Sequence, residues 1–364
     1  MEEVGGSILT PHGFIEGHLT FEDGMVVEVI DEPPRHPSVE GMVVPTLINA
    51  HTHVADMHVP VDLSLPLEEL VAPPDGLKHR ILRSMGKEEL SSIFQEASDL
   101  MFRRGISHFA DFRESGLFGS RVLRESALEG ALPVIMGRPE SPRFEREEME
   151  SLLAVVDGIG ISSVSDYDYA ELVEMASLTK RRGKMFALHA SERVREDLDL
   201  ILDLEPDFLI HMTMATDSDL DICAELDVPV VICPRSNLFF GRTPPLRRML
   251  EKGVTLGLGT DNAMISMPDI LSEMECAGRL LRHQGMKSLL PVLEMAIVNG
   301  RKLLELNEPI GIQPGSPCDF MVVGPRRGNT VIDLVLRSSV EDPLMVCKGE
   351  KIWREPGCAY SRRF

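Results

Sequence analysis

Histidine and aspartate side chains lie at the ends of four apolar segments with the pattern of β-strands. The segments read PTLINAHTH, KMFALHASE, DFLIHMT and VTLGLGTD, and they supply His51, His53, His189, His211 and Asp261. Imidazole nitrogens and carboxylate oxygens are ligands that proteins use for catalytic divalent metals. Separate strands that deliver such groups to one edge of a sheet can assemble a metal site. The sequence therefore predicts a metal-dependent hydrolytic enzyme.

The spacing within these segments adds to the prediction. His51 and His53 are two residues apart, so on an extended chain both side chains project from the same face. Glu192 follows His189 by three positions, which can place an acid–base group beside a metal ligand. Asp261 ends an apolar run, and a bound cation would remove the cost of burying its charge. A pair of buried, hydrogen-bonded histidines would explain the first motif alone, but the joint order of all these residues favours a metal site.

The middle of the chain alternates amphipathic helices with short apolar strands. A helix is predicted at residues 87–104, where apolar side chains recur on one face and Gly105 follows. Eight strands are predicted, near residues 43–50, 105–113, 132–138, 156–163, 184–190, 207–212, 228–233 and 254–260. This alternation indicates an α/β fold with parallel strands, and eight strands close a (β/α)8 barrel whose active site lies at their carboxyl ends. We therefore expect a TIM-like catalytic barrel over residues 45–309.

Both ends of the chain have the pattern of β-structure. Apolar and polar residues alternate on either side of Asp23-Gly24, a dipeptide typical of a tight hairpin turn. Near the carboxyl end, three further strands are predicted in the runs CDFMVVGP, VIDLVLRSS and LMVCKGEKIWRE. We therefore expect residues 1–44 and 310–364 to form one small β-sandwich domain.

The composition limits the partners and the location. The chain has 58 acidic and 37 basic residues and a net charge of −21, which argues against binding to nucleic acid or to an anionic membrane surface. The six cysteines form no CxxC pair, and the N-terminal residues lack the pattern of a signal peptide. No apolar run reaches the length of a membrane span. These features predict a cytoplasmic enzyme that acts on a small-molecule substrate.

The segments quoted above, together with CPRSN, LGLGTDNAM and IQPGSPCDFMVV, resemble those of the amidohydrolase superfamily. The resemblance spans nearly the whole chain and points to the branch of metal-dependent deaminases and chlorohydrolases, which includes cytosine, guanine and S-adenosylhomocysteine deaminases. It implies four metal ligands, namely His51, His53, His189 and Asp261. It also implies that His211 orients a water molecule, that Asp261 takes a proton from this water, and that Glu192 shuttles protons.

The same resemblance implies a single divalent ion. Binuclear members carry a lysine or a glutamate on the fourth strand, and the fourth predicted strand here, GIGISSV, has neither. Zinc is expected with nitrogen and oxygen ligands, and iron or manganese could occupy the same site. Relatives often carry a further histidine two or three residues after the one that matches His211, whereas Met-Thr-Met follows it here. The resemblance also implies a homo-oligomer.

The predicted groups fit more than one reaction. Hydrolytic deamination of a purine-, pyrimidine- or pterin-like ring, with release of ammonia, is favoured. Hydrolysis of an amide, a cyclic amide or a C–Cl bond uses the same activated water and is an alternative. A non-catalytic metal-binding barrel is a third interpretation, but it would need neither Glu192 nor His211.

Polar residues just beyond the strand ends are the candidates for substrate binding. They are Asp56, His58, Arg113, Glu114, Arg138, Ser236, Asn237 and Asn262. The arginines could bind an anionic group of the substrate, or they could pair with neighbouring acids. The Pro-rich segment after His53 is expected to be an irregular loop that closes over the pocket.

Overall fold

The chain folds into two compact units that share an α/β architecture. A computed structural model describes residues 1–65, 67–71, 75–324 and 330–356. The first unit consists of residues 1–48, 100–107 and 269–364, and the second of residues 49–99 and 108–268. Every residue predicted to bind a metal or to catalyse belongs to the second unit, which is therefore the unit that positions the site.

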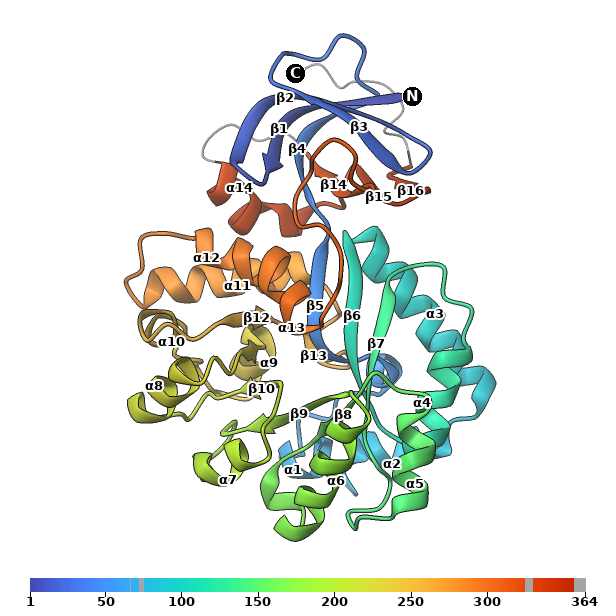
Figure 1. Cartoon of the computed structure of the whole chain (residues 1–364), viewed down its shortest axis with the longest axis vertical. Helices are drawn as coiled ribbons and strands as arrows, with labels where there is room; N and C mark the ends of the chain where they lie inside the picture. Colours follow the sequence, from blue (N-terminus) through green and yellow to red (C-terminus); the bar gives the residue numbers. More distant parts are fainter. Residues whose placement is uncertain (66, 72–74, 325–329, 357–364) are drawn as a thin grey trace. The chain divides into compact units, whose positions relative to one another are not determined.

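A curled parallel sheet is the main feature of the α/β fold (Figure 1). Its nine strands follow the order β12-β11-β10-β9-β8-β7-β6-β5-β13. They are β5 (Leu47–His53), β6 (Ile106–Arg113), β7 (Leu132–Gly137), β8 (Gly158–Ile161), β9 (Met185–Ala190), β10 (Phe208–His211), β11 (Val230–Ile232), β12 (Leu256–Leu258) and β13 (Asp261–Asn262). All residues of β5, β6, β8 and β10 are buried, as expected for parallel strands covered on both faces. The apolar runs that predicted strands between residues 105 and 260 all lie in this sheet.

The last segment of the sheet, which contains β12 and β13, pairs with strands on opposite sides of the sheet. β12 pairs with β11, and β13, which begins after Gly259 and Thr260, pairs with β5. Between them, the amide of Thr260 donates to the backbone oxygen of His51 at 2.9 Å. A Cβ on Gly259 would lie 2.7 Å from the Cβ of His51, so this close approach requires a glycine. The approach holds Asp261 beside the strand that carries His51.

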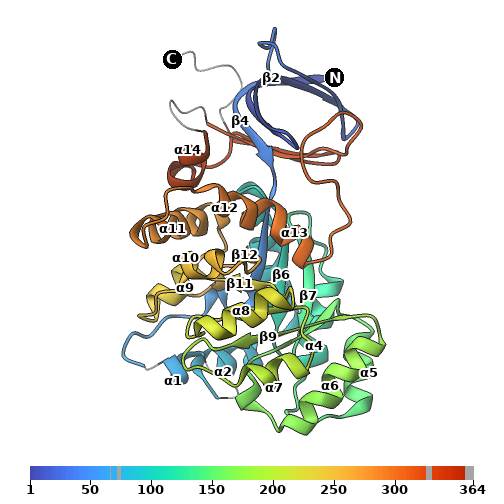
Figure 2. The same ribbon diagram turned by 60° about the vertical axis from the view of Figure 1, so that its left-hand side comes forward.

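Helices lie around the outside of the sheet (Figures 1 and 2). They are α3 (Lys87–Arg103), α4 (Gly116–Glu125), α5 (Arg146–Leu153), α6 (Tyr169–Arg181), α7 (Leu198–Asp203), α8 (Asp217–Glu225), α9 (Pro234–Phe239) and α10 (Leu246–Glu251), with a short 3-10 turn, η2 (Val164–Asp166), before α6. The helix predicted at residues 87–104 is α3, and its apolar residues Leu90, Phe94 and Ala97 are buried. No helix among the described residues is long and apolar enough to span a membrane.

The segment after β5 is more ordered than the sequence predicts. It contains a 3-10 turn, η1 (Val54–His58), and two helices, α1 (Leu67–Val71) and α2 (Leu77–Ser84). The prolines of this segment lie before α2, and the helix itself buries Leu82 together with Lys78, four residues earlier. The expectation of an irregular loop was wrong at η1 and α1, where helical turns form. The helix α2 lies beyond the predicted loop, where an amphipathic period follows the Pro-rich part.

Strands from both termini form a second, mixed sheet in the first unit. Its order is β16-β15-β14-β4-β1-β2-β3, with β1 and β4 parallel and the other neighbours antiparallel. The strands are β1 (Glu2–Thr10), β2 (Gly13–Glu22), β3 (Met25–Ile30), β4 (Val39–Pro45), β14 (Asp319–Val323), β15 (Met345–Lys348) and β16 (Lys351–Arg354). Figure 2 shows this sheet strongly curved. Asp23 and Gly24 join β2 to β3 with φ of 49° and 73°, the conformation that the Asp-Gly hairpin predicts.

Two predicted strands need correction. The run at residues 43–50 is not one strand, since β4 ends at Pro45 in the terminal sheet and β5 begins at Leu47 in the parallel sheet. The run VIDLVLRSS lies in a helix, α14 (Thr330–Arg337), and a Cβ on Gly278 would lie 2.6 Å from Cγ1 of Val335 in that helix. Its apolar residues fit a helical face as well as a strand, so packing against a neighbouring helix decides the structure. The other helical segments of this unit are α11 (Ile270–His283), α12 (Leu290–Leu293), the π-helix η3 (Glu294–Asn299), α13 (Gly300–Leu303) and η4 (Ser338–Val340).

Candidate active site

One histidine or aspartate from each of four strands meets at the carboxyl end of the parallel sheet. They are His51 of β5, His189 of β9, His211 of β10 and Asp261 of β13, which we call the His/Asp cluster. One possible ligand atom from each residue lies within 4.8 Å of those from the other three. Four donors at this separation could bind a metal ion. The sequence predicted three of them as ligands, His51, His189 and Asp261, and assigned His211 to the orientation of a water molecule.

His53, the fourth predicted ligand, lies next to the cluster. Its Nε2 is 3.6 Å from Oδ1 of Asp261, and its ring stacks on that of His189 with centroids 5.8 Å apart. Its Nδ1 donates to the backbone oxygen of Phe112 at 3.0 Å, and Nδ1 of His189 donates to that of Ile161 at 2.9 Å. These backbone acceptors fix both rings with Nε2 unprotonated, the form of the ring that binds a metal.

The protonation states of these residues suit a metal ion. Burial lowers the pKa of His51 and of His189, and burial together with the charge of Lys78 lowers the pKa of His53 to about 3. Burial alone would raise the pKa of Asp261, but the hydrogen bond from His51 holds it well below its usual range. The cluster region therefore presents neutral imidazoles and an ionised carboxylate, which are the states that ligate metals. In addition, Nδ1 of His51 is buried and has no hydrogen-bond partner among the described residues.

Two residues of the cluster have an unusual backbone and receive support from the start of α9. His211 and Asp261 have φ of 75° and 59°, a left-handed conformation that side chains other than glycine adopt at a cost of about 1–3 kcal/mol. The hydroxyl of Ser236 donates to Oδ2 of Asp261 at 2.5 Å, and the amide of Asn237 donates to Nδ1 of His211 at 3.2 Å. Ser236 and Asn237, predicted to bind substrate, contact and orient cluster residues in the structure.

Lys78 of α2 is the centre of a buried charged network that also contains Asp56, Asp111, Arg113 and Glu114. Nζ of Lys78 lies 2.7 Å from Oε1 of Glu114 and 3.1 Å from Oδ2 of Asp56. Arg113 is ion-paired with Glu114 and lies 3.1 Å from Oδ2 of Asp111. Every cation of this charged network therefore has carboxylates beside it, which is the arrangement that makes buried charge tolerable.

The charged network contacts the predicted site at two points. Oε1 of Glu114 lies 2.8 Å from Nδ1 of His53, and Nζ of Lys78 donates to Oδ1 of Asn262, the residue after Asp261. Lys78 was not predicted from the sequence, because it follows a Pro-rich segment. The helical period of LKHRILRS, which places Lys78 on the same face as Leu82, was the signal that could have found it.

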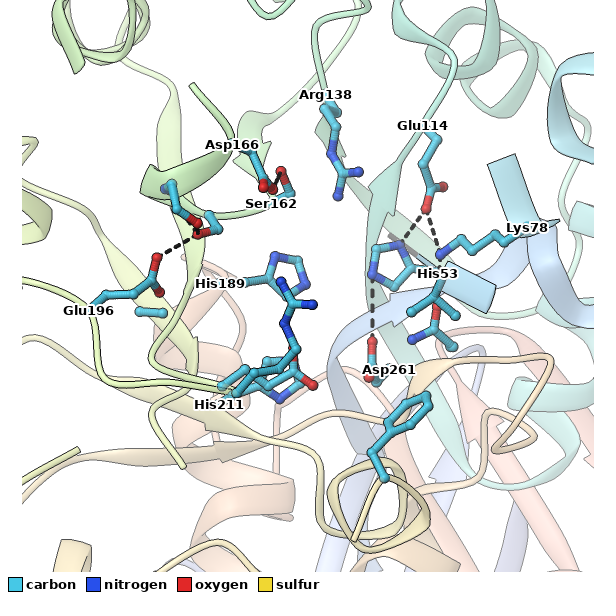
Figure 3. Close-up of a pocket in the computed structure, with 18 of the residues that line it drawn as sticks. His53, Lys78, Glu114, Arg138, Ser162, Asp166, His189, Glu196, His211 and Asp261 are labelled. Carbon is cyan, nitrogen blue, oxygen red and sulfur yellow. Dashed lines mark hydrogen bonds and ion pairs between the residues drawn. The ribbon is translucent and has the colours of Figure 1, made fainter. Parts of the chain in front are cut away.

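A cavity opens beside the His/Asp cluster (Figure 3). The described residues that line it include His53, Lys78, Glu114, Arg138, Ser162, Asp166, His189, Glu192, Glu196, His211, Asp261 and Asn262. The side chain of Glu192 is 23% exposed, and its Oε2 lies 3.9 Å from Nε2 of His211. The cavity thus joins a carboxylate that could transfer protons to the cluster that could hold a metal.

The other substrate-binding candidates fall into three places. Glu114, Arg138 and Asn262 line the cavity. Asp56 and Arg113 are fully buried in the charged network. The structure does not bring His58 to the cavity, since its half-exposed side chain pairs with Glu96 at 2.9 Å. Proximity in sequence to His53 was therefore a poor guide for His58, because η1 turns the chain away.

Comparisons with known proteins identify relatives of the chain. A model of the amidohydrolase family matches residues 42–349. The chain is 33% identical to the uncharacterized protein MJ0699 of Methanocaldococcus jannaschii, over 85% of this chain and 86% of the relative. It is 33% identical to a putative aminohydrolase of Methanothermobacter thermautotrophicus, over 96% and 97% of the two chains. It is 24% identical to a 5'-deoxyadenosine deaminase of the same organism, over 89% and 84%.

Solved structures have the same fold. An adenosine deaminase from Xanthomonas campestris with bound zinc superposes with a TM-score of 0.76 at 18% identity, over 96% of this chain and 92% of that one. Atrazine chlorohydrolase from Arthrobacter aurescens, complexed with zinc, also superposes with a TM-score of 0.76, at 16% identity and over 98% of this chain and 95% of that one. Together with the match over residues 42–349, which includes the whole His/Asp cluster, these similarities show that the chain belongs to the amidohydrolase family, as its motifs predicted.

Proposed function

We propose that the protein hydrolyses the amino group from an aminated heterocycle and releases ammonia. The observation that carries this proposal is the pair formed by Glu192 and His211, 3.9 Å apart at the wall of the cavity that also reaches Asp261. A purely structural metal site would need no such proton-transferring pair. The relatedness to a 5'-deoxyadenosine deaminase, at 24% identity, supports a purine-like ring as the first substrate class to test.

We also propose that the site holds one divalent ion, with zinc as the first choice. His51, His53, His189 and Asp261 would hold it, and the neutral imidazoles and ionised carboxylate described above fit such an ion. When bound, the ion would lower the pKa of a water molecule and so supply the nucleophile near neutral pH. His211 is assigned as a hydrogen-bond donor, because the amide of Asn237 donates to its Nδ1 and leaves the ring proton on Nε2.

The side chains then divide the proton transfers among them. Asp261 accepts a proton from the attacking water, while His211 donates a hydrogen bond that orients it. Glu192 gives a proton to the ring nitrogen next to the carbon under attack, which makes that carbon electrophilic. The proton held by Asp261 passes to the amino group of the tetrahedral adduct, the C–N bond breaks and ammonia leaves. The hydroxyl proton of the adduct returns to Glu192 as the carbonyl of the product forms. The hydrogen bond from Ser236 fixes Asp261 in the orientation that these two transfers require.

We infer that β12 and β13 act as one strand, so that the curled sheet corresponds to an eight-stranded (β/α)8 barrel over residues 45–309. The pairing of this segment with both β11 and β5 supports closure. Residues 1–44 and 310–364 would form the small β-sandwich, and their strands share one apolar core that includes Val4, Ile8, Phe320 and Cys347. We further propose a cytoplasmic location and a homo-oligomer.

Ammonia release is the measurement that tests the reaction. The zinc-loaded protein would be incubated with aminopurines and their nucleosides, cytosine and pterin, and in parallel with chlorinated and amide analogues. The expected result is ammonia in equal amount to the ring consumed. Release of chloride or opening of an amide without any ammonia would contradict deamination and favour the alternative hydrolases. Full zinc occupancy with no turnover of any compound would favour a non-catalytic barrel.

A further inference from the structure

Arg138 differs from the other buried cations near the site. It follows β7, lines the cavity and is only 9% exposed. Its Nε is buried with no hydrogen-bond partner, and no ion pair joins its side chain to any residue in the described part of the chain. Figure 3 shows its guanidinium pointing into the cavity.

The neighbouring cations show that this is not a general property of the site. Lys78 has carboxylate oxygens at 2.7 and 3.1 Å, and Arg113 is paired with both Asp111 and Glu114. The same chain therefore pairs two buried cations fully and leaves a third without an acceptor. Since an unpaired buried charge is unfavourable, a ligand that supplies an acceptor to the guanidinium of Arg138 would be bound strongly.

The carboxylates around the cavity do not supply the missing acceptor. Oδ2 of Asp166 accepts from the hydroxyl of Ser162 at 2.6 Å. Oε2 of Glu196 accepts from the amide of Ser191 at 2.8 Å, and Glu114 is held by Lys78 at 2.7 Å. Each of these acids has donors of its own, whereas the guanidinium of Arg138 faces the open cavity.

We propose that Arg138 binds an oxyanion of the substrate, a carboxylate or a phosphate, at the end of the molecule remote from the amino group that is removed. A planar guanidinium presents paired donors that match either group. The inference rests on the proposed deamination, since it assigns the second end of that substrate. It narrows the substrate to an anionic aminated heterocycle and predicts that neutral nucleosides are poor substrates.

Matched substrates test this selectivity. Zinc-loaded protein would receive adenosine, adenosine 5′-monophosphate and the 5′-carboxylate of adenosine, and the corresponding neutral and anionic cytidines and pterins. We expect the anionic member of the reactive set to have a kcat/KM about 10- to 100-fold higher, the gain of one charge-assisted contact. Arg138→Met should remove this preference, and Arg138→Lys should restore part of it. The comparison of kcat/KM between the 5′-carboxylate and the 5′-monophosphate identifies which oxyanion Arg138 binds. Equal kcat/KM for neutral and anionic members would overturn the proposal.

Binding without turnover separates this inference from the proposed reaction. The melting temperature of the zinc-loaded protein would be measured in inorganic phosphate, in acetate and in chloride of equal ionic strength. We expect the melting temperature of the wild type to be higher in phosphate or in acetate than in chloride. Arg138→Met should show no such increase. Arg247→Met, which removes an exposed arginine paired with Glu251, is the charge-matched control and should keep it. No anion-specific gain in the wild type, or the same gain in Arg138→Met, would overturn the proposal. A gain that depends on Arg138, without ammonia release from any compound, would contradict deamination and keep the anion site.

Discussion

The His/Asp cluster and the charged network are both buried, yet they balance their charges differently. In the cluster, the carboxylate of Asp261 lies beside His51 and His189, and burial lowers the pKa of both imidazoles. In the charged network, Lys78 and Arg113 each contact two carboxylates. The cluster can therefore accept a cation, whereas the cations of the network are already paired with carboxylates of the same chain. This difference assigns chemistry to the cluster and positioning of His53 and Asn262 to the network.

Replacement of Asp261 by asparagine should have the largest effect. The change removes the carboxylate of the cluster, which is both a proposed ligand and the proposed proton acceptor. We expect zinc content to fall and kcat/KM to drop by more than about 10⁴-fold, because a ligand and a proton-transfer group are lost together. Metal analysis and the ammonia assay measure both. Asp221→Asn, at a half-exposed aspartate paired with Lys252, is the control. Normal zinc content and normal activity in Asp261→Asn would show that the metal site and the proton acceptor lie elsewhere in the protein.

Glu192→Gln should separate proton transfer from metal binding. Glu192 lies at the cavity wall and is not among the proposed ligands, so zinc content should stay at the level of the wild type. The rate should fall by about 10²–10⁴-fold, the usual contribution of a general acid–base group. Glu251→Gln, at an exposed glutamate, serves as control. Full activity in Glu192→Gln would remove its assigned role, and loss of zinc would make it part of the cluster.

The sequence predicted the cluster well because each member ends an apolar strand. Parallel strands bring their carboxyl ends to one edge, so a one-dimensional pattern was enough to gather His51, His189 and Asp261. The role of His211 was harder to assign from sequence alone. Whether it ligates or donates depends on the proton of its ring, and the contact with Asn237 that fixes this proton joins two separate elements.

The charged network and the fold of the terminal part were less accessible to sequence. Arg113 ends β6 and Arg138 follows β7, so the sequence places both at strand ends. Only the three-dimensional positions of the acids show that Arg113 is paired and that Arg138 is not, among the described residues. Asp111 lies two residues before Arg113 on the same face of β6, so that pair could have been read from the period of a strand. The helix α14 was misread because its apolar residues fit both periods, and contact with α11 decides between them.

Lys78→Met should test whether the charged network stabilises the protein. The change leaves Asp56 and Glu114 buried without their shared cation, which typically costs about 3–5 kcal/mol in free energy of unfolding. Denaturant unfolding of the zinc-free protein measures this cost without the contribution of the metal. Lys87→Met removes an exposed lysine paired with Glu125 and should change stability by less than about 1 kcal/mol. If Lys78→Met unfolds like the wild type, the network does not depend on this lysine and the contrast with the cluster fails.

The smallest effect concerns the pH dependence of Asp56. Burial raises its pKa to about 7, against the opposing charge of Lys78. Between about pH 4 and pH 7 the unfolded chain releases this proton while the folded chain keeps it, so the free energy of unfolding should decrease as pH rises through that window. Asp56→Asn removes the titration, and its stability should fall less than that of the wild type between about pH 5 and pH 8. Equal pH slopes would show that the carboxyl is ionised throughout. A smaller slope in the variant would show that the folded protein keeps the proton of Asp56 into this pH range, because Lys78 offsets only part of the cost of burying its charge.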